Sequence, residues 1–378
     1  MTPAAAKQQS PVESSGDVLR HQRLLVSGQA RVDCSDFELV IVSGPDRLVW
    51  LNSLITQRVD DLLPGQTRES LILDPQGKIE FAFLLADDGV STWLLVEAPY
   101  GEALRNWLAS MVFRMDVSLT HRGNLRIVGS SGSLPPSKVL MEFVDPWPRV
   151  SEGSTGYAAE PHLGSSWQMT YSVLASTVEP SDFESLEREA LVPPVALDGL
   201  MIAAARPTMS EVDEKALPHE LDWLRTAVHL DKGCYRGQET VAKVHNLGHP
   251  PRRLTLLHLD GSHSTLPRAG DVLSHGDKAV GVITRAGWHY ELGPIALALL
   301  KRTTPVEVEL EVACEGVVIA ATQEVIVPPD AGATRGIPRL PRLSTRKELV
   351  GLAYGSHTDT SSPRSIRMEP EKPVYRLG

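Results

Sequence analysis

The residues with the clearest chemical potential lie in one segment, LDKGCYRGQETVAKVHNLG, residues 230–248. In this segment, Cys234 follows Lys232 by two residues and precedes Arg236 by two. Cationic neighbours favour the ionised thiolate, which is the nucleophilic and metal-binding form of cysteine. The spacing therefore indicates a functional thiolate at Cys234, with Lys232 and Arg236 as the groups that stabilise its charge.

The elements that must position this thiol are a loop and a helix. Residues 238–247 have helical periodicity, so Cys234 is expected just before a helix N-terminus, where the helix dipole also favours an anion. Gly233 and Gly237 allow backbone conformations that would present the sulfur at the surface. Glu239 fits the first helical turn, where its ordinary role is an ion pair along the helix.

The alternative for Cys234 is a partly buried structural thiol, which is the commoner state of a lone cysteine. The other two cysteines, Cys34 and Cys314, lie before and within strand patterns. Three distant cysteines without a CxxC pair fit a reducing compartment better than a disulfide framework. They cannot supply the usual ligands of an iron–sulfur cluster, so no permanently bound metal or cluster is expected.

Composition narrows the class of protein. The chain has 378 residues, 42% of them hydrophobic, and a formal net charge of −10. An acidic chain lacks the broad basic surface that non-specific nucleic-acid binding requires. Its apolar runs are shorter than a membrane span, and residues 1–20 lack a signal-peptide core. We therefore expect a soluble cytoplasmic protein that binds neither membranes nor, broadly, nucleic acid.

Hydrophobic patterning predicts an α+β body followed by a small β-barrel. In the body we expect strands at 38–43, 70–73, 79–85 and 92–96, helices at 47–56, 101–113 and 200–205, and mostly loops over 129–156. From residue 253 onward, short alternating strands separated by turns indicate the barrel. The expected organisation is a disordered segment at 1–30, the body at 31–249, the barrel at 250–328 and a disordered tail at 329–378. The tail holds nine Lys/Arg and five Asp/Glu, a net charge of +4.

The motif KGCYRGQE, residues 232–239, resembles the signature of the YgfZ-type proteins, which are folate-binding relatives of the glycine-cleavage T-protein, an aminomethyltransferase. The resemblance extends over about residues 31–328. It includes the opening strand and helix at 37–46, the LDPQGK hairpin at 73–78, the helix at 200–207 and the C-terminal strands.

This resemblance implies a fold, a cofactor and a role. The fold is a multi-lobed folate-binding body closed by a β-barrel, and the cofactor is tetrahydrofolate or another folate. The role is the assembly or repair of iron–sulfur enzymes, including the tRNA methylthiotransferase, with these clients or assembly proteins as partners. By position, the residues that match the motif are Lys232, Gly233, Cys234, Tyr235, Gly237, Gln238 and Glu239, whereas Arg236 is a candidate only for its positive charge near Cys234.

The resemblance also gives expectations for the folate pocket. Phe37 falls where the family can place a tryptophan next to folate, so it is a candidate for stacking on the pterin; the alternative is an ordinary core aromatic. The T-protein has its catalytic acid where this chain reads Phe81 and Ala82, and Glu80 is one residue out of register. The glutamate expected to bind the pterin is replaced by Ala203. We therefore expect weak folate binding and no aminomethyl transfer.

Three hypotheses follow. The first is an accessory factor for iron–sulfur proteins that works through the Cys234 thiolate. The second is a tetrahydrofolate-dependent one-carbon transferase or demethylase. The third is a redox-sensing protein in which Cys234 forms a mixed disulfide with a partner.

Overall fold

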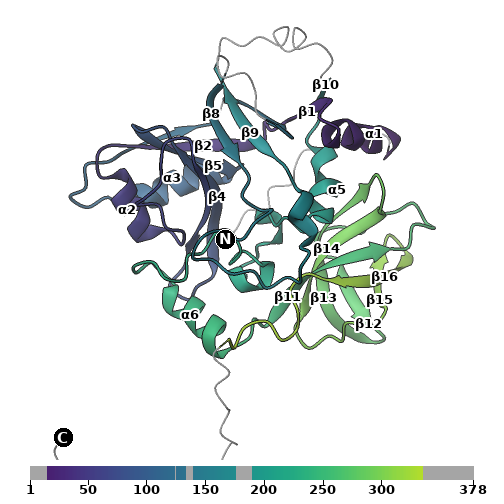
Figure 1. The fold of residues 1–378 in the computed structure, drawn as a ribbon. Coiled ribbons are helices and arrows are strands. Elements are labelled where there is room, and N and C mark those ends of the chain that lie inside the picture. The colour runs from purple at the N-terminus through teal and green to yellow at the C-terminus, as the bar shows by residue number, and fades with distance from the viewer. Residues whose placement is uncertain (1–14, 124, 133–138, 176–189, 335–378) are drawn as a thin grey trace, which may run out of the picture. The chain divides into compact units, whose positions relative to one another are not determined.

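The computed structural model describes residues 15–123, 125–132, 139–175 and 190–334. Within these ranges the chain forms two five-stranded sheets, a closed barrel and the helices that connect them (Figure 1). The predicted α+β class and the C-terminal barrel are confirmed. Residues 1–14 and 335–378, for which we expected disorder, lie outside the described residues.

The first sheet has the order β3-β4-β5-β2-β6, and all its neighbouring strands are antiparallel. The strands are β2 Phe37–Ser43, β3 Thr67–Leu73, β4 Ile79–Asp87, β5 Ser91–Glu97 and β6 Ser118–Arg122. Helices α2 (Arg47–Leu54) and α3 (Tyr100–Ser110) contact the sheet. Both faces are buried, so alternate residues serve two different cores: Leu84 packs in the central core, whereas Leu85 packs in the cluster that includes α2 and α3.

The second sheet has the order β10-β1-β7-β9-β8. Its strands are β1 Ala30–Asp33, β7 Arg126–Ser130, β8 Val139–Val144, β9 Thr170–Leu174 and β10 Ala190–Val192. β1 pairs with β10 in parallel, and the other neighbours are antiparallel. The expectation of loops over most of 129–156 is therefore wrong at β8, which pairs with β9.

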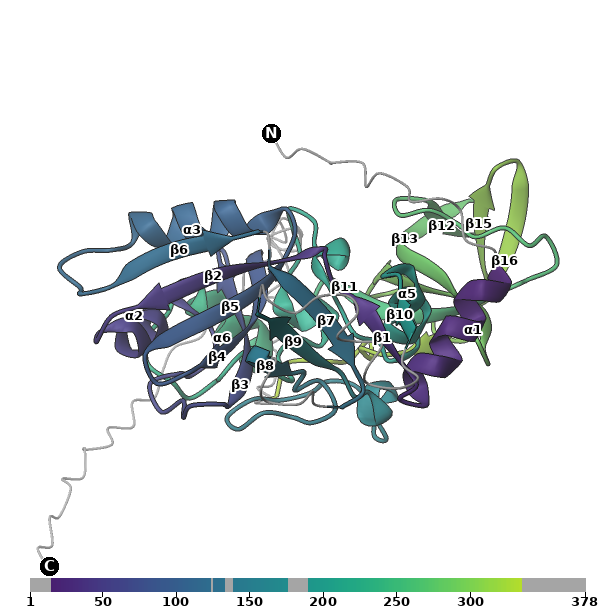
Figure 2. The same cartoon turned by 90° about the horizontal axis from the view of Figure 1, so that it is seen from above.

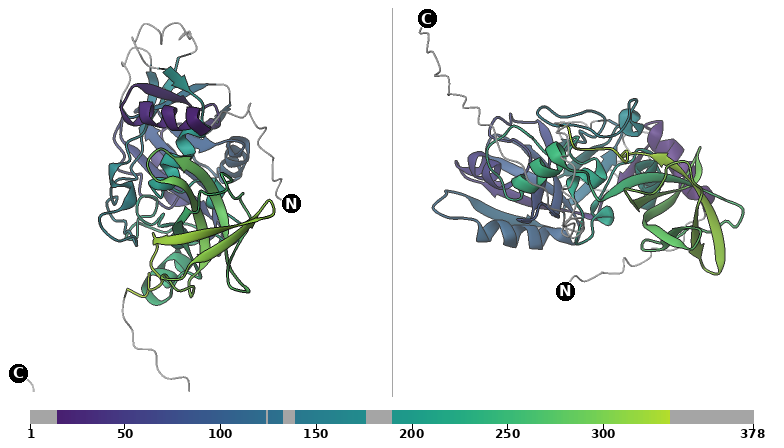
Figure 3. Two further views of the ribbon diagram at one scale, coloured as in Figure 1. Left: turned by 90° about the vertical axis from the view of Figure 1, so that its right-hand side faces the viewer. Right: turned by 90° about the horizontal axis from the view of Figure 1, so that it is seen from below.

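The barrel closes in the order β11-β14-β13-β12-β15-β16 and is shown in green and yellow in Figure 3. Its strands are β11 Arg252–Leu259, β12 Val272–His275, β13 Lys278–His289, β14 Gly293–Lys301, β15 Leu310–Cys314 and β16 Val317–Val325. Closure leaves no strand edge unpaired and buries an apolar interior, including Leu257, Leu273 and Val312. After the barrel, Val327 and Ala331 are also buried, so the packed chain extends past the expected boundary at residue 328.

A helix, α1 (Ser15–Val26), occupies part of the segment that we expected to be disordered. It packs beside α5 (Val195–Ala203) and against β13 (Figure 2). A buried glutamine stands in the centre of its packed face: Gln22 Nε2 donates to the carbonyl of Trp288, and the backbone N–H of Tyr290 donates to Gln22 Oε1. This polar residue interrupts the apolar period by which a helix is recognised in a sequence.

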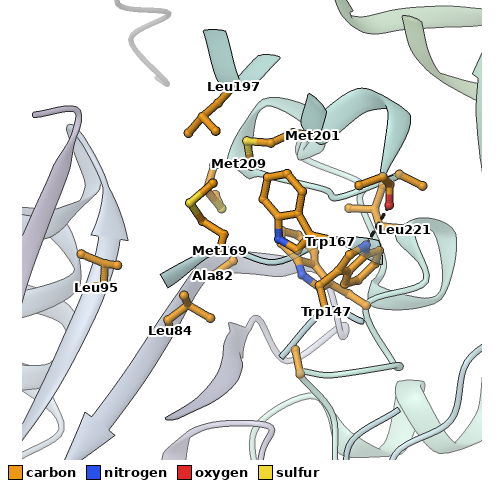
Figure 4. Close-up of a cluster of buried hydrophobic side chains, with 14 of the residues drawn as sticks. Ala82, Leu84, Leu95, Trp147, Trp167, Met169, Leu197, Met201, Met209 and Leu221 are labelled. Atoms are coloured by element: carbon orange, nitrogen blue, oxygen red, sulfur yellow. Dashed lines mark hydrogen bonds between the residues drawn. The ribbon is translucent and has the colours of Figure 1, made fainter. Parts of the chain in front are cut away.

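The central core joins side chains from the first sheet, the second sheet, α5 and the barrel. The remaining elements around it are α6 (Gln238–Leu247) and the short helices η2 (Leu163–Ser166), η3 (Met209–Glu211) and η4 (Pro218–Leu221). Figure 4 shows Leu84 and Leu95 on the strands of the first sheet, with Trp147, Trp167 and Met201 on the opposite side of the cluster.

Candidate functional site

The motif loop is held against the LDPQGK hairpin by close backbone contact. Gly237 has a φ of +83° at the start of α6, and a Cβ there would lie 2.6 Å from the carbonyl oxygen of Asp74. A Cβ on Gly77, at a φ of +79°, would lie 2.8 Å from a side-chain carbon of Thr240. Both positions therefore require glycine. The expected arrangement, a loop followed by a helix, is confirmed.

Cys234 is exposed at this loop, as expected for a presented thiol. The other two cysteines, Cys34 and Cys314, are buried, and burial raises the pKa of the Cys34 thiol. Cys234 is therefore the cysteine of this chain that a partner protein can reach. A Cβ at Gly233 would meet no atom within 4 Å and the residue has no positive φ, so the expectation that Gly233 is needed for a special backbone conformation is not borne out, in contrast to Gly237.

We expected Lys232 to stabilise the charge of the Cys234 thiolate, but its ammonium group instead donates hydrogen bonds to backbone carbonyls. The Nζ atom donates to the carbonyls of Asn52, Ile55 and Gln57 at 2.6, 2.7 and 2.9 Å. The side chain is buried, its Nζ lies 5.5 Å from the centre of the Tyr235 ring, and desolvation lowers its pKa to about 8. All three N–H donors of the Lys232 ammonium group are thus used by carbonyls at the C-terminal end of α2. These hydrogen bonds connect the motif loop to that helix.

Replacing Lys232 with methionine should lower the free energy of unfolding by about 3 kcal/mol or more, because buried carbonyls lose their donors. Urea unfolding followed by circular dichroism measures this loss. The matched control is Arg236→Met, which removes a partly exposed ion pair and should cost less than about 1 kcal/mol. Equal stability of the two variants would contradict the structural role of Lys232.

Arg236 is held by an acid and an aromatic ring. Its Nη1 lies 2.6 Å from Oε2 of Glu80, and its guanidinium carbon lies 5.7 Å from the centre of the Trp107 ring. About a third of each charged side chain is exposed, at 32% and 33%. Glu80 is the acid nearest in sequence to the expected catalytic position, and here its carboxylate is paired with the motif arginine.

The rest of the motif has supporting roles. Tyr235 is buried in the central core, and Gln238 Nε2 donates to the carbonyl of Lys232 at 3.3 Å. Glu239 lines a shallow surface pocket together with Leu230 and Tyr235.

A second candidate site is a small cavity of about 40 Å³ in the central core. Phe37 lines it and stacks at an angle on Tyr171, with 5.2 Å between ring centres. Ala82 also lines it, so a methyl group stands on the wall at the position where the resemblance places an acid. The structure thus brings together two residues, Phe37 and Ala82, that are far apart in the sequence.

Sequence reasoning missed the charged groups beside this cavity. Arg206 Nη1 lies 2.7 Å from Oε1 of Glu69, and Arg206 Nε lies 2.9 Å from Oδ2 of Asp145, with all three side chains buried. Burial raises the pKa of the Glu69 carboxyl, and the positive charge of Arg206 only partly offsets this rise. Burial alone would lower the pKa of Arg206, but the negative charges of Asp145 and Glu69 outweigh it and raise that pKa. The sequence feature that could have indicated this cluster is Arg206, a charged residue that follows an apolar helix and precedes Pro207.

The segment that carries Arg206 is also where the folate-binding glutamate was expected. Ala203 ends α5 and brings no polar group, and Ala205 has a φ of +51° in the left-handed region. Met201 and Arg206 from this segment line the cavity.

Comparison with known proteins shows similarity to aminomethyltransferases. No protein-family model matches the chain. An aminomethyltransferase of Rippkaea orientalis is 27% identical over 318 residues, covering 76% of this chain and 84% of that protein. An aminomethyltransferase of Nostoc is 27% identical over 340 residues, covering 79% and 85%.

The crystal structure of the glycine cleavage system aminomethyltransferase T from Bartonella henselae has the same fold. It matches with a TM-score of 0.63 and 20% identity, over 82% of this chain and 89% of that one. Together, the sequence similarity and the fold support a relationship to the T-protein superfamily. They do not separate the YgfZ-type proteins from the aminomethyltransferases.

The described residues include no helix long and apolar enough to cross a membrane. Over the same ranges, no group of three or more His, Cys, Asp or Glu side chains is arranged to hold a metal ion.

Proposed function

We propose that this chain is a folate-binding accessory factor for iron–sulfur enzymes, and that it works through the thiol of Cys234. The observation that carries this proposal is the contrast between its two sites. The motif loop presents an exposed cysteine on a firmly packed backbone, whereas the cavity has Ala82 where a transferase would need a carboxylate. This contrast favours a role for the exposed thiol over aminomethyl transfer.

Folate binding is supported by the relatives, because aminomethyl transfer uses tetrahydrofolate as its acceptor in the family that this chain resembles. The position of Phe37 on the cavity wall also supports it, since an aromatic ring can stack on a pterin.

Tetrahydrofolate should bind the wild-type chain with a dissociation constant above about 1 µM. The loss of a carboxylate partner at Ala203 removes a charge-assisted hydrogen bond, worth about 1.5–3 kcal/mol. Isothermal titration calorimetry measures this constant. Sub-micromolar binding would mean that another acid replaces the missing one.

A one-carbon transferase is the second candidate, and the names of the relatives favour it. Two acids, Glu69 and Glu97, do line the cavity. However, Glu69 is paired with Arg206, and Glu97 Oε1 accepts the backbone N–H of Met209 at 3.2 Å. A catalytic acid needs freedom to exchange its proton with the substrate, which these contacts oppose.

The redox-sensing alternative needs a second thiol. Because Cys34 and Cys314 are buried, that thiol would have to come from a partner protein.

The experiment that tests the proposed function compares the activities of several iron–sulfur enzymes in cells with and without this chain. We expect a loss of activity in the deletion strain for some of these enzymes and no loss in enzymes without clusters. Equal activities throughout would reject the accessory role.

A further inference from the structure

The shallow surface pocket beside the motif loop, called the α6 groove from here on, has no role in the proposed function as stated so far. Its volume is about 300 Å³. It is lined by two residues that precede α6 and four residues of the helix itself: Leu230, Tyr235, Gln238, Glu239, Val241 and Ala242. Tyr235 directly follows Cys234 in the chain, so the groove begins one residue from the exposed thiol.

The α6 groove is mostly apolar, and its walls are packed before any partner binds. The side chains of Tyr235 and Val241 are buried, at 7% and 1% exposed. Nε2 of His219 donates to the carbonyl of Val241 at 3.1 Å, and Gln238 Nε2 donates to the carbonyl of Lys232 at 3.3 Å. A pre-formed pocket at the low end of the usual range of about 300–1,000 Å³ suits one or two apolar side chains better than a whole cofactor.

The charge that a partner meets beside the thiol is negative. The two cations of the motif are used inside the chain, because Lys232 donates to three carbonyls and Arg236 is paired with an acid of β4. The acids Asp231 and Glu239 are both exposed, and Glu239 lines the groove. Lys243, an exposed cation of α6, does not line it. A basic group on a partner is therefore favoured at this face.

We propose that the α6 groove is a docking site for an extended segment of a partner protein. In this segment an apolar side chain enters the groove, a basic side chain lies beside Glu239, and a cysteine meets Cys234. That the partner is an iron–sulfur client rests on the proposed function. An apolar residue two positions from the partner's cysteine can reach the groove, because an extended chain advances about 3.3 Å per residue.

The test uses short peptides whose cysteine is carried as a mixed disulfide with thionitrobenzoate. In the exchange, the sulfur of Cys234 forms a disulfide with the peptide sulfur, the thiol proton passes to the buffer, and thionitrobenzoate leaves as a coloured thiolate. The reference peptide has a leucine two positions from its cysteine and an arginine next to that leucine. Two further peptides replace the leucine with serine or the arginine with glutamate. At low peptide concentration, we expect the reference peptide to react with the wild-type chain about tenfold faster than either of them.

Matched variants locate the preference in the groove. Ala242→Phe fills the groove and leaves the thiol in place, so it should remove the preference for leucine. Leu247→Phe adds a ring at an exposed position at the end of the same helix, outside the groove, and should keep the preference. Glu239→Lys should remove the preference for arginine, and it carries the test at an exposed position if Ala242→Phe does not fold.

Two further controls isolate the reaction at the groove. Cys234→Ser gives the background from the buried thiols. Each rate is divided by the rate of the same variant with dithiobis(nitrobenzoate), which has neither a leucine nor an arginine, so that changes in the thiol itself cancel.

The outcomes separate this inference from the proposed function, because the peptide assay contains no client enzyme. Equal rates for the three peptides would overturn the docking site, as would an unchanged preference for leucine in folded Ala242→Phe or for arginine in Glu239→Lys. If the preferences hold while cells without this chain keep full iron–sulfur enzyme activity, the docking site stands and the client assignment falls.

Discussion

In a glycine-cleavage assay that contains the partner proteins, aminomethyl transfer by this chain is expected to be undetectable, because its rate should lie below that of an authentic T-protein by a factor of at least about 10² to 10⁴. This range is the usual contribution of a positioned acid or base to catalysis. Ala82 lines the cavity with a methyl group at the expected position of the acid. Glu80, one residue out of register, is paired with Arg236 at 2.6 Å.

An aminomethyltransferase that carries its acid is the positive control, assayed at the same tetrahydrofolate concentration. Saturating tetrahydrofolate removes weak binding as the cause of a slow rate. Turnover within about tenfold of the control would contradict our interpretation of Ala82, because a missing general acid or base costs more than this.

Much of the fold could be predicted because its patterns are local. The first sheet alternates between two cores, and the barrel strands have alternating patterns and are separated by clear turns, so both are visible in the sequence. The second sheet could not be recognised in this way. Its parallel pair β1 and β10 is only three to four residues long per strand, and the two strands lie far apart in the chain.

The site was predictable where its residues are neighbours in sequence. The position of Cys234 between two glycines and just before a helical segment was enough to predict the motif loop. The contacts of Lys232 could not be inferred, because its acceptors lie 175 to 180 residues away. The same holds for Glu69, Asp145 and Arg206, which come from different parts of the chain and meet only in the folded core.

Replacing Cys234 with serine should abolish the support of iron–sulfur enzymes while leaving the fold intact. Serine keeps the size and a hydrogen-bonding group, but its hydroxyl does not ionise near neutral pH and is a poor ligand for soft metals. Since Cys234 is exposed, the substitution leaves no cavity in the core. Its unfolding midpoint in urea should equal that of the wild-type chain.

The matched control is Cys314→Ser in the barrel. Cys314 is buried, and its Sγ donates to the carbonyl of Leu266 at 3.4 Å, a bond that a serine hydroxyl can also make. This variant changes the same chemical group away from the motif loop, so any effect on client enzymes would have to come from stability alone.

The most direct measurement is the restoration of iron–sulfur enzyme activity in cells that lack this chain, with each variant expressed to the same level. We expect the wild-type chain and Cys314→Ser to restore activity and Cys234→Ser to leave it at the level of the deletion strain. Full restoration by Cys234→Ser would contradict the claim that this thiol performs the function.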